Sequence, residues 1–223
     1  MELTTTQPIQ IMGFKERSTQ QIKQLFQLTT LTEMPELTEW LNAPSNIPPE
    51  TVRFLDDLSL FAKDRIWFWN EDELKLHFIF PFMHHLNLRS PHFSVFAERP
   101  IRATFDNSIQ LRGTFDLLIA SGEYEPELPY FCFHEYKKEK GTADDPIAQL
   151  LCAMLVGWHM NEAEFPIYGV YVVGRNWFFV VLKDNTYAIS NVYSITRIDD
   201  LKTIFSILKY LEILIPRNLN PTK

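Results

Sequence analysis

The chain has 223 residues, which is enough for one hydrophobic core and short for two domains. Hydrophobic residues make up 46% of it and charged residues 22%, values that are ordinary for a globular protein and exclude a largely disordered chain. The formal net charge of −7 counts against a broad surface that binds nucleic acid passively, although a phosphate contact confined to one cleft stays compatible with it.

The sequence favours a location inside the cell. The first ten residues have neither the basic start nor the apolar run of a signal peptide, and no apolar window reaches membrane-spanning length without a charge. Cys132 and Cys152 each lie in an apolar run, which indicates buried thiols rather than a disulfide or a metal site. We therefore expect a cytoplasmic protein with no membrane partner.

The first third of the chain is predicted to be helical. Apolar residues recur there at helical spacing, and the segment SNIPPE breaks the pattern before the third helix. These helices, up to about Ala62, are expected to form an extension, residues 1–62, that packs on one domain spanning residues 1–223. The predicted helices cover residues 18–28, 35–41 and 50–62.

A fourth helix is predicted over residues 70–88. Asn70 is a suitable N-cap, and the acidic residues that follow favour the positive end of a helix dipole. Apolar residues such as Leu74 and Phe78 form one face of this helix. Pro81 is expected to kink or interrupt it, because proline lacks a backbone N–H.

Beyond residue 92 the chain favours β-branched and aromatic residues in short runs, which indicates strands. An apolar helix capped by Asp145, with Pro146 at its first position, interrupts them, and a last helix, capped by Asp199 or Asp200, is expected to end at Pro216. This order predicts an α/β fold with a central mixed sheet of about four to six strands flanked by helices. The predicted strands cover residues 93–98, 101–105, 109–120, 130–138, 167–174, 176–183 and part of 187–195.

Three charged residues stand out in otherwise apolar strands. Asp116 lies within one strand, where a carboxylate is costly unless it is paired or binds a cation. Glu135 and Lys137 end the next strand, and because strand side chains alternate they share one face, with Tyr136 on the other. If the two strands are neighbours, these groups meet at one edge of the sheet. Carboxylates that bind Mg²⁺ or Mn²⁺, with a lysine that orients water or neutralises charge, suit hydrolysis of a phosphodiester.

The pattern GTFD, residues 113–116, followed by EYK, residues 135–137, resembles the PD-(D/E)xK superfamily of restriction-endonuclease-like folds. In that superfamily an Asp on one strand and an E-x-K on the next form the metal site, and here Phe115 stands in place of the Pro. The resemblance implies a restriction-endonuclease-like sheet, a Mg²⁺ or Mn²⁺ ion held by Asp116 and Glu135, and Lys137 as a catalytic residue.

The resemblance extends to two further positions. The segment E-x-x-L-K-x-x-F-I-x-P-F-M, which starts at Glu71, is similar to the first helix of nuclease domains of type I restriction subunits. Glu71 best fits the acid that this helix supplies to the metal or to a water, and Glu73 is the alternative. Gln149, the only polar side chain in the run IAQLLCAMLVG, matches a Gln that often contacts the site. The resemblance covers about residues 70–182.

Three functions stay open at this point. The first is a Mg²⁺- or Mn²⁺-dependent nuclease that acts on nucleic acid, with DNA favoured over RNA, and that could form a homodimer. The second is a nuclease fold without activity that binds nucleic acid or protein, which the acidic charge favours. The third is a structural or protein-interaction domain with no nucleic-acid role, whose sign would be Asp116 and Glu135 lying far apart in the fold. The presence of Asp116, Glu135 and Lys137 together favours the nuclease.

Overall fold

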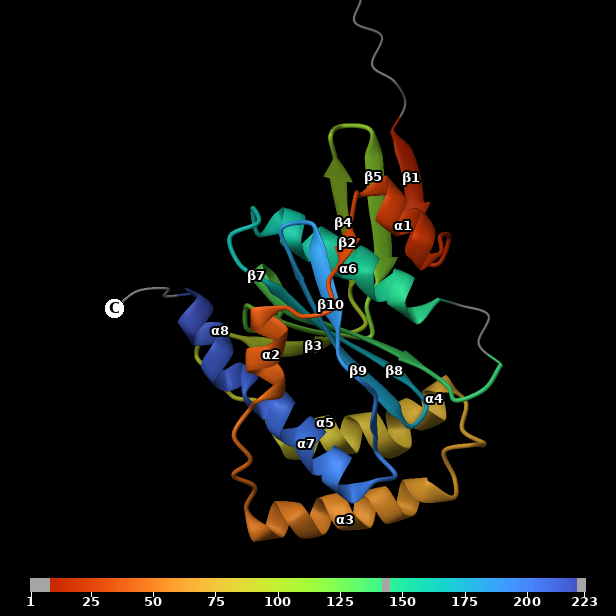
Figure 1. The fold of residues 1–223 in the computed structure, drawn as a ribbon, viewed down its shortest axis with the longest axis vertical. Coiled ribbons are helices and arrows are strands. Elements are labelled where there is room, and N and C mark those ends of the chain that lie inside the picture. The colour runs from red at the N-terminus through yellow and green to blue at the C-terminus, as the bar shows by residue number, and fades with distance from the viewer. Residues whose placement is uncertain (1–8, 142–144, 220–223) are drawn as a thin grey trace, which may run out of the picture.

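The computed structural model describes residues 9–141 and 145–219 (Figure 1). They form a mixed α/β fold in which a large mixed sheet is flanked by helices and a smaller sheet stands beside it. The larger sheet has eight strands and the smaller one three, so the prediction of about four to six strands was too low. Two of the strands have only two residues, too few for any periodic pattern to reveal them.

The larger sheet combines parallel and antiparallel pairs. Its strands are β2 (Thr29–Thr30), β3 (Ser94–Ala97), β6 (Leu117–Ser121), β7 (Glu127–Lys137), β8 (Ile167–Val173), β9 (Asn176–Lys183), β10 (Thr186–Ile189) and β11 (Tyr193–Ser194). The order is β2-β10-β9-β8-β7-β6-β3, and β11 pairs with β9. β6 and β7 are antiparallel neighbours, whereas β7 and β8 run parallel because helix α6 (Pro146–Met160) connects them.

The smaller sheet divides a segment that the sequence pattern treats as one strand. It consists of β1 (Gln10–Gly13), β4 (Pro100–Phe105) and β5 (Ile109–Thr114) in the order β1-β5-β4. The predicted strand 109–120 ends at Thr114, and the chain crosses to the larger sheet before β6 begins at Leu117. Asp116 therefore lies between two strands, and the prediction that it lies inside one is wrong. At this crossing Asp116 belongs to neither sheet, and its carboxylate accepts a hydrogen bond from the backbone of β7.

Helices cover both faces of the larger sheet (Figure 1). Helix α6 packs on one face, and α3, α5 and α7 lie on the other. Alternate strand residues feed two hydrophobic clusters, so that on β7 Phe133 faces α6 while its neighbour Cys132 faces away. The other helices are α1 (Thr19–Leu25), α2 (Pro35–Leu41), α3 (Pro49–Lys63), α4 (Glu71–Leu74), the π-helix η1 (Lys75–Ile79), α5 (Phe80–Leu86), α7 (Ile198–Lys209) and α8 (Leu211–Leu219).

Residues 9–62 contain the three predicted helices and two strands that the sequence analysis missed. β1 pairs in parallel with β5, and β2 pairs in parallel with β10. The expectation of a purely helical extension is therefore wrong, because this segment contributes an edge strand to each sheet. Both strands are short and mostly exposed, which leaves no alternating apolar pattern to read.

The helix that begins after Asn70 has the predicted cap, and Pro81 does not end it. Asn70 and Glu73 form a reciprocal capping box. Pro81 lies in the first turn of α5, and the turn before it widens into η1, where the Phe80 N–H bonds to the Lys75 carbonyl five residues earlier. The helix is thus interrupted by a wider π-helical segment, and it continues past the proline.

Two predictions for the last helix are wrong. Arg197, not Asp199 or Asp200, occupies the N-cap position of α7. The Asp200 carboxylate instead accepts a hydrogen bond from the Ser194 N–H at 2.7 Å. Pro216 lies inside α8 rather than at a helix end.

Cys132 and Cys152 are buried, as predicted, and both thiols are free. Within residues 9–141 and 145–219, no helix has the length and apolar character needed to cross a membrane.

Phe82→Ala is expected to lower the free energy of unfolding by about 3–5 kcal/mol, because Phe82 is fully buried and its ring packs against Phe78, Trp177 and Phe205. Urea denaturation measures this loss. Phe68→Ala is the matched control, since that side chain is 85% exposed and its removal should cost less than about 0.5 kcal/mol. Equal losses in the two variants would contradict the described core.

Candidate functional site

The candidate site lies where the chain passes between the two sheets. The chain leaves β3 for β4 at Glu98 and returns from β5 to β6 at Asp116. The two crossings touch, because the Glu98 N–H donates to the Asp116 carbonyl at 3.2 Å. Glu98 has a left-handed backbone, with φ of 52°, which is uncommon for a residue with a side chain. Two carboxylates therefore stand side by side at the junction.

The end of β7 brings Glu135 and Lys137 to the same place. The Lys137 ammonium donates to Glu135 Oε1 at 2.6 Å, so these side chains share a face as predicted. Tyr136 lies on the opposite face, where its hydroxyl bonds to His134 Nδ1 at 2.7 Å. The Tyr136 N–H donates to Asp116 Oδ2 at 2.6 Å, which ties the crossing to β7. Asp116 and Glu135 line one cavity, so the sign of a purely structural domain is not observed.

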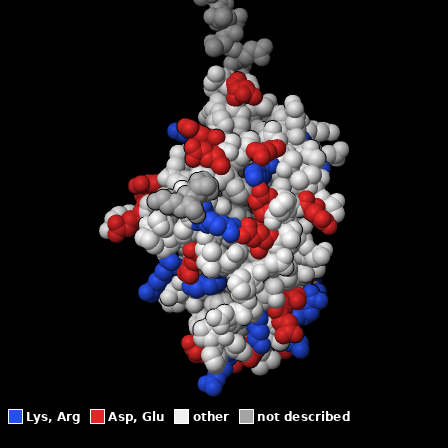
Figure 2. Space-filling model, turned by 60° about the vertical axis from the view of Figure 1, so that its left-hand side comes forward, with Lys and Arg blue, Asp and Glu red and all other residues white. Residues whose placement is uncertain are grey.

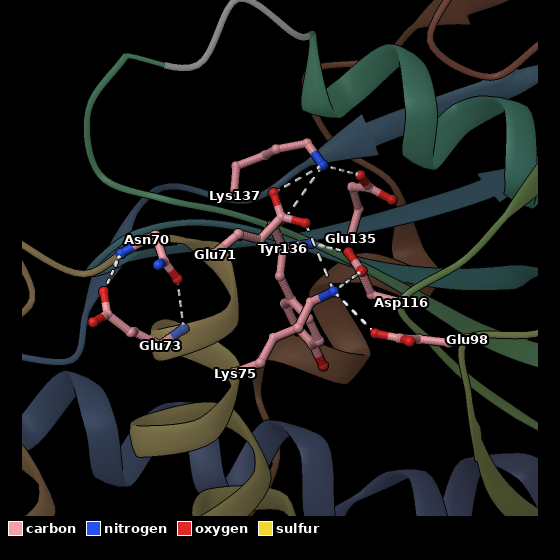
Figure 3. Close-up of polar contacts among 9 residues, drawn as sticks. All are labelled: Asn70, Glu71, Glu73, Lys75, Glu98, Asp116, Glu135, Tyr136 and Lys137. Carbon is pink, nitrogen blue, oxygen red and sulfur yellow. Dashed lines mark hydrogen bonds and ion pairs between the residues drawn. The ribbon is translucent and has the colours of Figure 1, made fainter.

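Glu71, and not Glu73, faces this cluster (Figure 3). The Glu71 carboxylate lies 3.5 Å from the Lys137 ammonium and 3.6 Å from that of Lys75. Glu73 points the other way and accepts a hydrogen bond from the Asn70 N–H at 2.8 Å. The capping box therefore turns Glu73 away from the cavity, and of the two acids Glu71 is the one that lines it.

Lys75 belongs to the site and was missed by the sequence analysis. Its ammonium lies 2.5 Å from Asp116 Oδ1 and 3.3 Å from Glu98 Oε1 (Figure 3). Burial disfavours its charge, but the hydrogen bond and attraction to Asp116, helped by Glu71 and Glu98, outweigh burial and raise the pKa of Lys75. A weak signal existed, because Lys75 follows Glu71 by four residues and shares its helix face. No sequence pattern pointed to Glu98, which lies between β3 and β4.

Burial also shifts the pKa of the Glu135–Lys137 pair. Burial and the nearby charge of Asp116 raise the pKa of Glu135 to about 7, although Lys137 opposes the shift. Burial works against the charge of Lys137, but the attraction and hydrogen bond of Glu135 outweigh it and raise the pKa of Lys137. Near neutral pH the lysine is therefore a fixed cation, while Glu135 is close to its titration point.

Gln149 completes the site from α6. Its side chain is 2% exposed, and its Nε2 makes no hydrogen bond among the described residues. A buried amide donor without an acceptor is costly, so its position calls for an acceptor inside the cavity. The cavity measures about 450 Å³ and is lined by Gly13, Phe14, Lys15, Glu16, Glu71, Glu98, Arg112, Gly113, Thr114, Asp116, Glu135, Lys137 and Gln149.

The donors around the cavity suit a hard divalent cation by their chemistry. Four carboxyl groups, from Glu71, Glu98, Asp116 and Glu135, face the ammonium groups of Lys75 and Lys137, so these six groups carry an excess of negative charge even when Glu135 is protonated. Carboxylate oxygens are the ligands that Mg²⁺ and Mn²⁺ prefer. The lysines lie between these oxygens, and among the described residues no three His, Cys, Asp or Glu side chains are already arranged to hold a metal ion. The donor set fits Mg²⁺ or Mn²⁺, but the side chains must rearrange before the carboxylate oxygens can bind the ion.

Comparison with known proteins assigns no family. No protein-family model matches the chain, and no curated protein sequence matches it.

Glu135→Gln is expected to gain stability relative to the wild type as the pH rises from 4.5 to about 7. The raised pKa of Glu135 means that the folded protein binds this proton more tightly than the unfolded chain. Its stabilisation is therefore full below 4.5 and is lost as the pH rises through about 7. The amide cannot ionise and escapes this loss.

Thermal unfolding of both proteins across this pH range, in EDTA, measures the effect. His134, whose pKa burial lowers to about 3, loses its stabilising contribution as the pH falls below 6.5, but it does so in both proteins. The difference between the two Tm values therefore reports Glu135. A difference that stays constant with pH would contradict the raised pKa.

Proposed function

We propose that the chain is a metal-dependent nuclease of the PD-(D/E)xK kind. One observation carries the proposal: the five residues selected from the sequence, Glu71, Asp116, Glu135, Lys137 and Gln149, all line the same cavity. They come from four separate parts of the chain, a helix, a crossing, a strand and a second helix. Independent surface residues would have no reason to converge in this way.

The topology around the cavity supports a restriction-endonuclease-like fold. β6, which follows Asp116, is the antiparallel neighbour of β7, which carries Glu135 and Lys137. The β7-α6-β8 unit then carries Gln149 back over the same sheet. The sequence resemblance implied this relation between the Asp, the E-x-K and the Gln.

Each side chain has a defined role in the proposed reaction. Asp116, Glu135 and Glu71 would hold Mg²⁺ or Mn²⁺, which when bound supplies Lewis-acid stabilisation and a water of lowered pKa. Lys137, 3% exposed and charged, neutralises negative charge that develops on the phosphate or orients the attacking water. The Gln149 amide, for which the described part of the chain supplies no acceptor, donates to a phosphate oxygen or to that water.

Two arginines beside the cavity support a nucleic-acid substrate. Arg112 lines the cavity, and Arg102 stands directly opposite it in the β4–β5 ladder. Both are exposed, and neither makes an ion pair with any described residue. Like charges in directly opposed positions repel, so an anion that contacts both would be stabilising, and a phosphodiester backbone supplies one. Figure 2 shows basic and acidic side chains interspersed on the face in view, which fits a narrow contact rather than a broad basic surface.

DNA is the proposed substrate over RNA because of the resemblance to restriction nucleases. A homodimer would present one site to each strand of a duplex, and we propose it on that ground alone.

A second candidate function is a nuclease-fold module that binds nucleic acid or protein without cleaving it. It is favoured by the state of Asp116, since Oδ1 bonds to Lys75 and Oδ2 to the Tyr136 N–H. Both oxygens that would bind a metal already have partners. The two candidates differ in whether Mn²⁺ binds at Asp116.

Asp116→Asn and Lys137→Met are each expected to lower Mn²⁺-dependent cleavage at least about 100-fold, because the first weakens the proposed metal site and the second removes a positive charge beside the reacting phosphate. Plasmid, linear duplex, single-stranded DNA and RNA are incubated with Mn²⁺ or with EDTA. Full activity in either variant would overturn the mechanism. A wild type that neither cleaves these substrates nor binds Mn²⁺ would favour the binding module.

Glu71→Gln and Glu73→Gln form a matched pair, two residues apart on one helix. Glu71→Gln is expected to reduce cleavage because Glu71 faces the cavity. Glu73→Gln should retain cleavage and lose about 1 kcal/mol of stability or less, because it weakens only the capping box. Cleavage assays and urea denaturation separate the two effects, and a reversed pattern would show that the wrong acid has been assigned to the site.

A further inference from the structure

Lys75 has three acidic partners, and besides Glu71 at 3.6 Å the two nearer ones differ strongly in exposure. Asp116, 2.5 Å from the ammonium, is 12% exposed, whereas Glu98, 3.3 Å away, is 60% exposed. The Lys75 side chain is itself 10% exposed, so it connects a buried carboxylate to one at the rim of the cavity (Figure 3). One ammonium therefore has a partner on each side without any movement of its helix.

The contact with Asp116 is incompatible with a metal ion on the same oxygen. Asp116 Oδ2 accepts the Tyr136 N–H, so Oδ1, which Lys75 holds, is the oxygen whose protein partner can swing away. An ammonium and a divalent cation in contact with one oxygen would repel each other strongly in a buried site. Metal binding at Asp116 therefore requires Lys75 to withdraw.

We propose that Lys75 is a positioning residue that holds Asp116 in place until a divalent cation binds, and then withdraws to Glu98. This inference rests on the proposed metal site. The fold prepares the second partner, because the Glu98 N–H bonds to the Asp116 carbonyl and keeps the two acids adjacent. Withdrawal needs a change of side-chain torsions only, since the ammonium already contacts Glu98. Lys75 thus stands in for the metal, and Glu98 lowers the cost of its displacement.

The test is the Mn²⁺ affinity of the full chain, measured by isothermal titration calorimetry without nucleic acid. Lys75→Gln is expected to bind Mn²⁺ about tenfold more tightly, because a charge-assisted contact no longer competes for Asp116. Glu98→Gln is expected to bind about threefold more weakly, because Lys75 loses its exposed partner. In the double variant the Glu98→Gln effect should largely vanish, since no lysine remains to be displaced.

Two further variants make the result specific. Lys183→Gln removes another lysine that makes a 2.7 Å ion pair, with Glu36, away from the cavity, and it should leave the affinity unchanged. Asp116→Asn should abolish Mn²⁺ binding. Circular dichroism checks that each variant is folded. If Lys75→Gln does not fold, the inference still requires that Glu98→Gln binds Mn²⁺ more weakly than the wild type.

The outcomes separate this inference from the proposed function. Equal or weaker Mn²⁺ binding in Lys75→Gln overturns the role of Lys75, and if binding still depends on Asp116 the proposed metal site stands. An equal loss from Glu98→Gln with and without Lys75 means that Glu98 contacts the ion itself, which also overturns the inference. Absence of Mn²⁺ binding in both the wild type and Lys75→Gln overturns the inference and the metal site together.

Discussion

The Asp116 carboxylate is the contact on which the rest of the site depends. Through Oδ2 it bonds to the backbone of β7 at Tyr136, and through Oδ1 it bonds to Lys75 in the π-helix η1. One side chain thus joins the helix, the junction and the strand that carries the E-x-K pattern. A carboxylate that is only 12% exposed would be costly without these partners, so removing either one leaves its charge less well compensated in the folded state.

The junction between the sheets explains why carboxylates gather there. A residue within a β-ladder has its backbone committed to its neighbours, and its side chain must point to one face or the other. A residue at a crossing between sheets is free of this constraint. Glu98 and Asp116 sit at two touching crossings, and the left-handed backbone of Glu98 stores strain where the side chain meets Lys75. The crossings thereby bring two carboxylates to the ends of regular elements that carry Lys75, Glu135 and Lys137.

Local chemistry made part of this site predictable. Alternation along one strand was enough to pair Glu135 with Lys137, and cap chemistry was enough to identify Asn70 and Asp145. The remainder depends on contacts between distant segments. The predicted strand 109–120 is broken because its first part belongs to the smaller sheet, and no local sequence pattern indicates that second sheet. Lys75 looked like an ordinary helix residue, because its importance comes from a carboxylate about 40 residues away that only the folded chain brings near.

The parallel pairing of β1 with β5 has a consequence for the order of folding. Gln10 pairs opposite Ile109, so β1 is synthesised about 100 residues before the strand it pairs with. The residues just after β1, including Phe14, form one wall of the cavity, and the Phe14 ring packs closely over Gly113. β1 and Phe14 therefore cannot dock before β5 has been made. Until they dock, the charged cluster stands open to solvent on that side.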